Sequence, residues 1–125
     1  MPKTILIVDD SSSVRQVLGL LLKGAGFTVV EASDGREALD KLGKLKGERI
    51  HLVISDVNMP NMDGIAFLKA FKLLPEHRFT PMLMLTTESQ EAKKREGQAA
   101  GAKAWVVKPF KPEQMLAAVE KLVLP

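Results

Sequence analysis

The chain contains no cysteine and no tyrosine, and its aromatic side chains are limited to five phenylalanines and one tryptophan. The absence of cysteine excludes disulfide frameworks and thiolate metal sites. Proteins that bind nucleic acids concentrate basic charge and interleave aromatic side chains, whereas this chain is poor in aromatics and has a net charge of only +3. We therefore expect no direct contact with nucleic acid.

Long hydrophobic runs are also missing. No apolar run approaches the roughly 18 residues needed to span a membrane. Residues 1–4 lead into an apolar run without the pattern of a signal peptide. We expect a cytoplasmic protein with no membrane association. A length of 125 residues with 46% hydrophobic residues fits one compact domain that covers residues 1–125.

Short apolar runs alternate with amphipathic stretches five times along the chain. We predict the runs to be strands, at residues 5–8, 27–32, 52–55, 82–85 and 104–107. A helical stretch follows each of them; in the first, the apolar residues at helical spacing are Val14, Val17, Leu18, Leu21 and Leu22. This alternation predicts buried parallel strands joined by right-handed crossovers. The predicted fold class is α/β, a doubly wound five-stranded parallel sheet flanked by five helices.

The fourth helical stretch, roughly residues 89–100, is the weakest of the five. It contains no large apolar residue, and Gly97 costs about 1 kcal/mol in a helix interior. Little packing would hold such a helix in place. We therefore expect it to be the most mobile element of the domain.

Polar residues follow four of the predicted strands. Asp9 and Asp10 come after the first strand, Asp56 after the third, Thr86 after the fourth and Lys108 after the fifth. The carboxyl ends of parallel strands meet at one edge of a sheet, so these side chains should lie together. Crowded carboxylates repel one another, and a divalent cation would relieve that repulsion. A ligand set made of oxygens alone favours Mg²⁺, with Mn²⁺ as an alternative.

A phosphoryl group at this edge would give each residue a role. Asp56 could act as a nucleophile and form an acyl phosphate. Lys108 could neutralise one phosphoryl oxygen, and the Thr86 hydroxyl could donate a hydrogen bond to another. Metal, ammonium and hydroxyl would then surround the charge that develops during phosphoryl transfer.

Together and in this order, the motifs resemble the receiver domains of two-component response regulators, and the resemblance covers essentially the whole chain. The segments that carry it are Val8-Asp9-Asp10, Ser55-Asp56-Val57-Asn58-Met59-Pro60, Met62-Asp63-Gly64, Leu85-Thr86-Thr87 and Val107-Lys108-Pro109-Phe110. The resemblance implies a sheet with the strand order 2-1-3-4-5. It also implies a cis peptide bond between Lys108 and Pro109.

The resemblance further implies a role for each acidic residue. Asp56 matches the phospho-accepting aspartate. Asp10 matches a direct Mg²⁺ ligand, and Asp9 matches a neighbour that usually acts through water. Asn58 matches the position whose main-chain carbonyl binds the metal.

Three more residues match functional positions of the family. Thr86 matches the switch hydroxyl, and Lys108 matches the lysine that contacts the phosphoryl group. Trp105 stands where the family commonly has a rotameric Tyr or Phe, so we assign it to the switch together with Thr86. In resembling proteins, the fourth helix, the fifth strand and the fifth helix form the partner-binding face.

We therefore expect a phosphorylation-activated signalling switch rather than an enzyme, with at most weak self-directed phosphoryl transfer and autodephosphorylation. The phosphodonor would be a sensor histidine kinase or a phosphotransfer protein. A separate downstream output protein would bind the face just described, as in chemotaxis signalling, and the chain itself would be a monomer. A phosphorelay intermediate and a receiver cut from a longer regulator remain alternatives.

Proteins of two other classes share parts of the pattern. A Mg²⁺-dependent aspartyl-phosphate phosphatase of the haloacid dehalogenase type needs a second aspartate two residues after its nucleophile, where this chain has Asn58. A flavodoxin-like carrier of FMN would use Ser11-Ser12-Ser13 as its phosphate loop. Asp9 and Asp10 would repel that phosphate, and the chain has no tyrosine to stack on a flavin. Both classes fit the sequence less well than the receiver does.

The two histidines, His51 and His77, have no partner at metal-ligand or phosphorelay spacing. We interpret both as ordinary surface residues.

Overall fold

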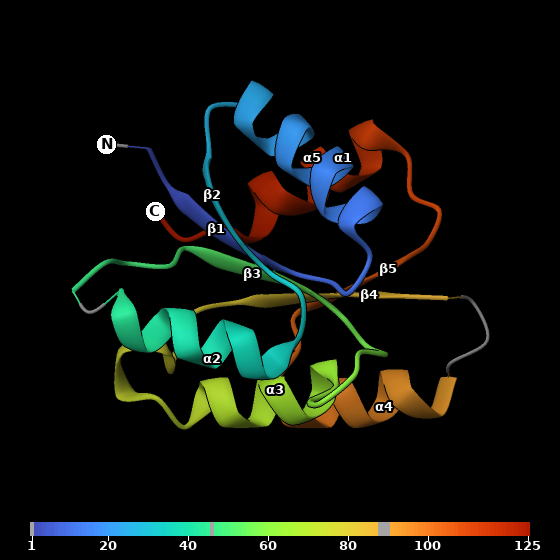
Figure 1. Cartoon of the computed structure of the whole chain (residues 1–125). Helices are drawn as coiled ribbons and strands as arrows, with labels where there is room; N and C mark the ends of the chain where they lie inside the picture. Colours follow the sequence, from blue (N-terminus) through green and yellow to red (C-terminus); the bar gives the residue numbers. More distant parts are fainter. Residues whose placement is uncertain (1, 46, 88–90) are drawn as a thin grey trace.

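The computed structural model describes residues 2–45, 47–87 and 91–125. Five parallel strands form one sheet in the order β2-β1-β3-β4-β5 (Figure 1). The fold class and the strand order expected from the sequence are therefore confirmed. The elements in chain order are β1 (Thr4–Val8), α1 (Ser12–Gly24), β2 (Thr28–Ala32), α2 (Gly35–Lys44), β3 (Leu52–Asp56), α3 (Gly64–Lys72), the 3-10 turn η1 (Pro75–His77), β4 (Met82–Thr86), α4 (Glu91–Ala100), β5 (Ala104–Val107) and α5 (Pro112–Leu122).

Helices cover both faces of the sheet. In Figure 1, α1 and α5 lie on one side of the strands, and α2, α3 and α4 lie on the other side. Side chains alternate along β1, so that Ile5 and Ile7 pack toward α1 and α5 while Leu6 and Val8 pack toward α2 and α3. The central strand β3 is buried along its whole length, as its apolar sequence predicts.

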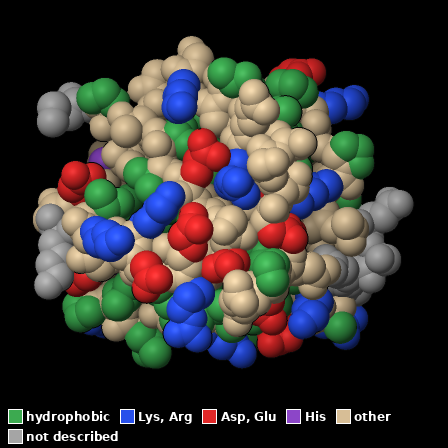
Figure 2. Space-filling model, in the orientation of Figure 1, with side chains coloured by type: hydrophobic (Ala, Val, Ile, Leu, Met, Phe, Trp, Pro, Cys, Tyr) green, Lys and Arg blue, Asp and Glu red, His purple; other side chains and the backbone are tan. Residues whose placement is uncertain are grey.

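The surface charge is mixed. On the face drawn in Figure 2, acidic and basic side chains are interspersed, and no continuous basic patch forms on that face. Among the described residues, no helix combines the length and the apolar character that crossing a bilayer requires.

The strand register brings the polar residues to one edge of the sheet. Neighbouring pairs near that edge are Val8 with Ser55, Asp56 with Leu85, and Thr86 with Val107. Asp56 and Thr86 are the last residues of β3 and β4, while Asp9 and Lys108 directly follow β1 and β5. The carboxyl edge therefore carries the residues that the sequence analysis placed together.

Among the helices that begin at this same edge, α1, α2 and α3 each have a side-chain cap. The capping contacts are Val14 N to Ser11 Oγ at 3.3 Å, Glu37 N to Asp34 Oδ1 at 2.8 Å, and Ala66 N to Asp63 Oδ1 at 2.8 Å. Each cap satisfies a backbone donor that the first helical turn leaves without an intrahelical acceptor. The caps thereby fix the loops that surround the carboxyl edge.

The helix α4 is held by few side chains, as its sequence suggests. Its expected start at residue 89 lies outside the described residues. Glu96 forms an ion pair with Lys69 of α3 at 3.5 Å. A β-carbon added to Gly97 would lie 2.6 Å from Cζ3 of Trp105, which is closer than real β-carbons approach other atoms. The glycine that lowers the helix propensity is therefore the residue that lets the indole ring reach the helix backbone.

Trp105 occupies the face of the sheet that α3 and α4 cover. It is half-buried and pairs with Met84 across the β4–β5 ladder. Thr86 pairs instead with Val107, two residues further along β5. Residues two apart in a strand share a face of the sheet. Trp105 is therefore the neighbour of Val107 on the same face of β5, on the side away from the carboxyl edge.

The interpretation of both histidines as ordinary surface residues is wrong. His77 is only 5% exposed, and its ring stacks on Phe71 with 4.8 Å between the centroids. The turn η1 places it there, and no sequence periodicity marks such a contact. His51 is half-buried, and its Nδ1 accepts a hydrogen bond from Thr4 N at 3.0 Å. Burial lowers the pKa of both histidines, so their imidazoles stay neutral at neutral pH.

We expect Gly97→Ala to destabilise the protein, although alanine is the better helix former by about 1 kcal/mol. The added methyl group must displace the indole or the helix, and overpacking of this kind costs about 1–3 kcal/mol. Gly43→Ala is the matched control, because a β-carbon there meets nothing within 4 Å. Urea unfolding should show a lower free energy of unfolding for Gly97→Ala and a higher one for Gly43→Ala. A gain for both would show that Trp105 does not press on α4.

Candidate functional site

Three carboxylates meet at the carboxyl edge, as the sequence predicts. Asp9 is fully buried, Asp56 is 8% exposed, and Asp10 faces solvent. One oxygen from each of the three lies within 4.8 Å of the others. The cluster therefore has two carboxylates fixed in the protein and one on its open side.

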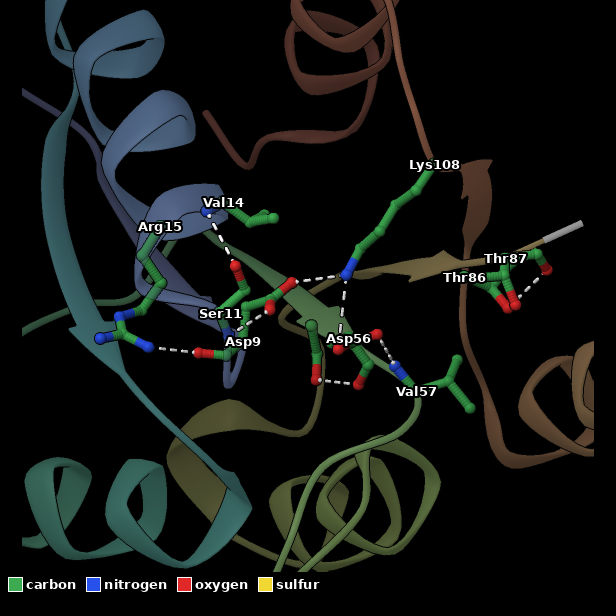
Figure 3. A network of polar contacts seen from close by, with 10 residues as sticks. Asp9, Ser11, Val14, Arg15, Asp56, Val57, Thr86, Thr87 and Lys108 are labelled. Atoms are coloured by element: carbon green, nitrogen blue, oxygen red, sulfur yellow. Dashed lines mark hydrogen bonds and ion pairs between the residues drawn. The ribbon is translucent and has the colours of Figure 1, made fainter.

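Every polar group of Asp9 forms a hydrogen bond, and Figure 3 shows those to Ser11, Arg15 and Lys108. Its Oδ1 accepts from Ser11 N at 2.9 Å, and its Oδ2 accepts from Lys108 Nζ at 2.9 Å. Its main-chain N donates to the Ala32 carbonyl at 3.1 Å, and its carbonyl accepts from Arg15 Nη1 at 2.6 Å. Asp9 is thus positioned by β2, by the first turn of α1 and by the residue after β5.

Arg15 is a contributor that the sequence analysis missed. Besides Asp9, its guanidinium contacts Glu31 of β2, with 3.4 Å between Nε and Oε1. A positive side chain near a helix N-terminus opposes the helix dipole. That unfavourable placement was the one signal in the sequence that could have drawn attention to Arg15.

Asp56 presents its carboxylate at the end of β3. Its Oδ1 accepts from Val57 N at 2.8 Å, and its Oδ2 lies 3.4 Å from Lys108 Nζ. Burial, and then the negative charge of Asp9, raise the pKa of Asp56 to about 6. Lys108 opposes this shift without cancelling it. Asp56 is therefore ionised at neutral pH but destabilised in that form.

Lys108 places one ammonium group between two carboxylates. The peptide bond between Lys108 and Pro109 is cis, as the resemblance implies. Burial acts to lower the pKa of Lys108, but the hydrogen bond to Asp9 and the charge of Asp56 outweigh it and raise the pKa. The ammonium group therefore stays charged and offsets part of the local negative charge.

Thr86 and Trp105 lie apart from this ammonium–carboxylate contact. Thr86 is 2% exposed, and its Oγ1 donates to the Thr87 carbonyl at 3.1 Å. In Figure 3, Thr86 and Thr87 lie to one side of Lys108 and Asp56. The structure brings Thr86 to the predicted edge, whereas Trp105 packs against Gly97 of α4.

The loop after β3 is tied down at two places. A β-carbon on Gly64 would lie 1.9 Å from the Asp56 carbonyl oxygen, so only glycine allows this close approach of α3 to β3. Asn61 has a positive φ of 65°, and its Nδ2 donates to Asp34 Oδ2 at 2.8 Å. Asn58 lies exposed on the same loop. The Asp34–Asn61 contact, which the sequence analysis missed, therefore anchors the loop that carries Asn58.

The residues present fit a hard divalent cation. The donor set consists of carboxylate oxygens, one of them open to water, which matches the preference of Mg²⁺ for one or two carboxylates with several waters. A cation there would also relieve the repulsion from Asp9, which adds to the effect of burial in raising the pKa of Asp56. Asp9, Asp10 and Asp56 are therefore the side chains that could hold the metal.

Comparison with known proteins agrees with this geometry. The chain matches the family model described as the response regulator receiver domain over residues 5–120. It is 35% identical over 123 residues to the transcriptional regulatory protein SrrA of Staphylococcus aureus, in an alignment that covers 98% of this chain and 48% of SrrA. The chain thus spans about half the length of the curated relatives it matches.

Solved structures give the same family. The chemotaxis protein CheY4 of Vibrio cholerae superposes with a TM-score of 0.91 at 47% identity, covering 98% of this chain and 100% of that chain. A putative response regulator from Chloroflexus aurantiacus superposes with a TM-score of 0.89 at 36% identity, covering 98% of both chains.

We expect Asp56→Asn to stabilise the metal-free protein at neutral pH. Because the folded-state pKa of Asp56 is raised from 3.8 to about 6, folding favours its protonated form. The free energy of unfolding of the wild type should therefore fall as the pH rises through this interval, by on the order of 3 kcal/mol, and stay low above it. Asp56→Asn should lack this fall.

The measurement is urea unfolding in EDTA from about pH 4 to about pH 8. Asp40→Asn on the exposed side of α2 is the control, and it should keep the wild-type profile. Parallel profiles for wild type and Asp56→Asn would contradict the raised pKa.

We expect the Asp34–Asn61 contact to support metal binding. Asn61→Gly keeps the positive φ but removes the donor, and Asp34→Ser keeps a helix cap but removes the second acceptor oxygen. Either change should loosen the loop that carries Asn58 and weaken Mg²⁺ binding about tenfold, as loss of an outer contact often does. Calorimetric titration of Mg²⁺ measures this. The double variant should lose no more Mg²⁺ affinity than either single variant. Additive losses of affinity would show that the two residues act separately.

Proposed function

Since this chain belongs to the response regulator receiver domain family, we propose that it is a switch that accepts a phosphoryl group on Asp56 from a sensor histidine kinase or a phosphotransfer protein. A receiver domain is a signalling domain of a two-component system, and its family binds Mg²⁺ in an acidic pocket. The observation that carries the proposal is the contact of Lys108 Nζ with both Asp9 and Asp56, inside a cluster of three carboxylates.

The proposed transfer is a displacement at phosphorus. A carboxylate oxygen of Asp56 forms a bond to phosphorus while the bond from phosphorus to the donor's histidine nitrogen breaks, and the histidine leaves with the electron pair. With a pKa of about 6, Asp56 is ionised at neutral pH and needs no separate base. Its raised pKa also makes it more basic than an ordinary carboxylate.

The neighbouring residues receive matching roles in this proposal. Asp9, Asp10, Asp56 and the main-chain carbonyl of Asn58 would hold Mg²⁺, which neutralises charge on the transferring group when bound. Lys108 would turn from Asp9 toward the phosphoryl oxygens, from a starting distance of 3.4 Å between its Nζ and Asp56 Oδ2. Thr86 would turn its hydroxyl from the Thr87 carbonyl to a phosphoryl oxygen.

The output proposed is a change in the face formed by α4, β5 and α5. Movement of Thr86 on β4 would disturb the side-chain layer that holds Trp105, and Trp105 in turn presses on Gly97 of α4. A partner protein that binds this face better in the shifted state would read the phosphorylation. The self-directed chemistry proposed is limited to slow phosphoryl uptake and hydrolysis.

The likeness to the chemotaxis protein CheY4 supports a chemotaxis-like role for a monomer in the cytoplasm, with residues 1–125 as the receiver domain. The likeness to the transcriptional regulatory protein SrrA supports a second possibility, a receiver that belongs to a longer regulator. A phosphorelay intermediate is a third. In all three the phosphoryl chemistry on Asp56 is the same, and no direct contact of this domain with nucleic acid or membrane is proposed.

Incubation with acetyl phosphate and Mg²⁺ should add one phosphoryl group, visible by intact mass and lost in base as acyl phosphates are. Asp56→Asn keeps the shape of the side chain but removes the nucleophile, so it should stay unmodified. Asp40→Asn on the exposed side of α2 is the control and should be modified like the wild type. Modification of Asp56→Asn at the wild-type rate would place the acceptor elsewhere.

A further inference from the structure

Two large apolar side chains stand out from the surface on the connection between α3 and β4. Leu73 is 82% exposed and Phe79 is 80% exposed, more than any other large apolar side chain among the described residues. Both precede β4, whose far end carries Thr86. We call Leu73, Phe79 and the basic residues Lys72, Arg78 and Lys103 the α3–β4 surface. It lies at the edge of the sheet opposite Asp56.

The connection is held firmly, so the exposure does not come from a loose loop. His77 N donates to the Leu74 carbonyl, and Thr80 N donates to the His77 carbonyl, at 3.0 and 3.1 Å. The buried ring of His77 stacks on Phe71. Thr80 Oγ1 donates to the Ile50 carbonyl at 3.4 Å. The segment is thus fixed by hydrogen bonds and ring stacking while Leu73 and Phe79 remain in water. An apolar patch exposed on an ordered surface is a candidate interaction site.

Lys72 ties the surface together. It directly precedes Leu73, and its Nζ donates to the carbonyls of Arg78 and Thr80, the residues on either side of Phe79. The turn between α4 and β5 also lies beside Lys72, because a β-carbon on Gly101 would be 3.9 Å from Lys72 Cε. Lys103 follows that turn, and its charge acts on Lys72. Lys72 therefore joins the residues on either side of Phe79 to the α4–β5 turn, and Leu73 is its neighbour in sequence.

The charge of this patch is positive. Among the ion pairs formed by the described residues, none includes Lys72, Arg78 or Lys103. The Arg78 guanidinium lies 5.3 Å from the centroid of the Phe79 ring, where it interacts with the ring face. Glu76 on η1 is the acidic residue of this connection, so positive charge exceeds negative charge there.

We propose that the α3–β4 surface docks an acidic amphipathic segment of a partner protein. Apolar side chains of the segment would cover Leu73 and Phe79, while its carboxylates would pair with Arg78 and Lys103. Aromatic and arginine side chains carry a large share of the energy of protein interfaces. Two copies of this surface would repel each other, so charge complementarity selects an acidic partner over a second copy of the chain. This docking is independent of the phosphoryl chemistry proposed for Asp56.

The test uses a synthetic helical peptide with leucine and phenylalanine on one face and glutamate on the other, titrated into ¹⁵N-labelled protein. Amide shifts should change at residues 72–80 and 101–103, with a dissociation constant below about 1 mM. Added salt should weaken binding, because it screens exposed charges. The same peptide with lysine in place of glutamate should not bind.

The double variant Leu73→Ser/Phe79→Ser should weaken binding at least tenfold. The matched control is Val17→Ser/Leu20→Ser, which removes two exposed apolar side chains of α1 and should bind like the wild type. No binding at millimolar peptide, equal binding of the lysine peptide, or shifts that map elsewhere would overturn the proposal. Two further outcomes would also overturn it. The first is a change of the amide shifts at residues 72–80 with protein concentration in the absence of peptide, which would mean self-association. The second is binding of the protein to vesicles of anionic lipid that is abolished in Leu73→Ser/Phe79→Ser.

Discussion

The contact of one ammonium group with two carboxylates, Lys108 Nζ at 2.9 Å from Asp9 and 3.4 Å from Asp56, is the interaction around which the site is built. Three carboxylates brought within 4.8 Å repel one another, and a buried charge without a partner costs several kcal/mol. The sheet makes this crowding unavoidable, because parallel strands deliver their carboxyl ends to one edge. Lys108 lowers the cost without removing it, since the pKa of Asp56 remains raised. The negative charge that Lys108 leaves uncompensated is what a divalent cation or a phosphoryl group would act upon.

The central strands and α3 are closely packed, whereas α4 is not. β3 and β4 are buried along their whole length, and Gly64 packs α3 so closely on β3 that no side chain fits. In contrast, α4 carries no large apolar side chain of its own and contacts β5 through Trp105 at Gly97. In the proposed switch, a change in charge at Asp56 would therefore act on the side formed by α4 and β5, where the packing is least close.

The sequence predicted the parts of this arrangement that depend on chain direction. Asp9, Asp10, Asp56 and Lys108 follow apolar runs, and the strand order carries them to one edge, so their meeting follows from topology alone. The contacts that position them did not follow. These contacts join residues that have no periodic relation in the sequence. They are the hydrogen bond from Arg15 to the Asp9 carbonyl, the hydrogen bond from Asn61 to Asp34, and the packing of Trp105 on Gly97. The burial of His77 is likewise not marked by any periodicity. Such contacts depend on which side chains meet after folding, and a pattern of apolar residues carries no record of them.

The same topology places the carboxylate site and the α3–β4 surface at opposite ends of the sheet. β4 links Thr86 at the carboxyl edge to the connection that carries Leu73 and Phe79, yet all five of its residues are buried in a strand paired on both sides. A strand held in this way keeps its register, because it is paired along both of its sides. Rearrangement at Asp56 should therefore leave the α3–β4 surface in place. A partner docked there would stay bound in both phosphorylation states, which suits a surface that recruits the domain, while the α4–β5–α5 face would report its state.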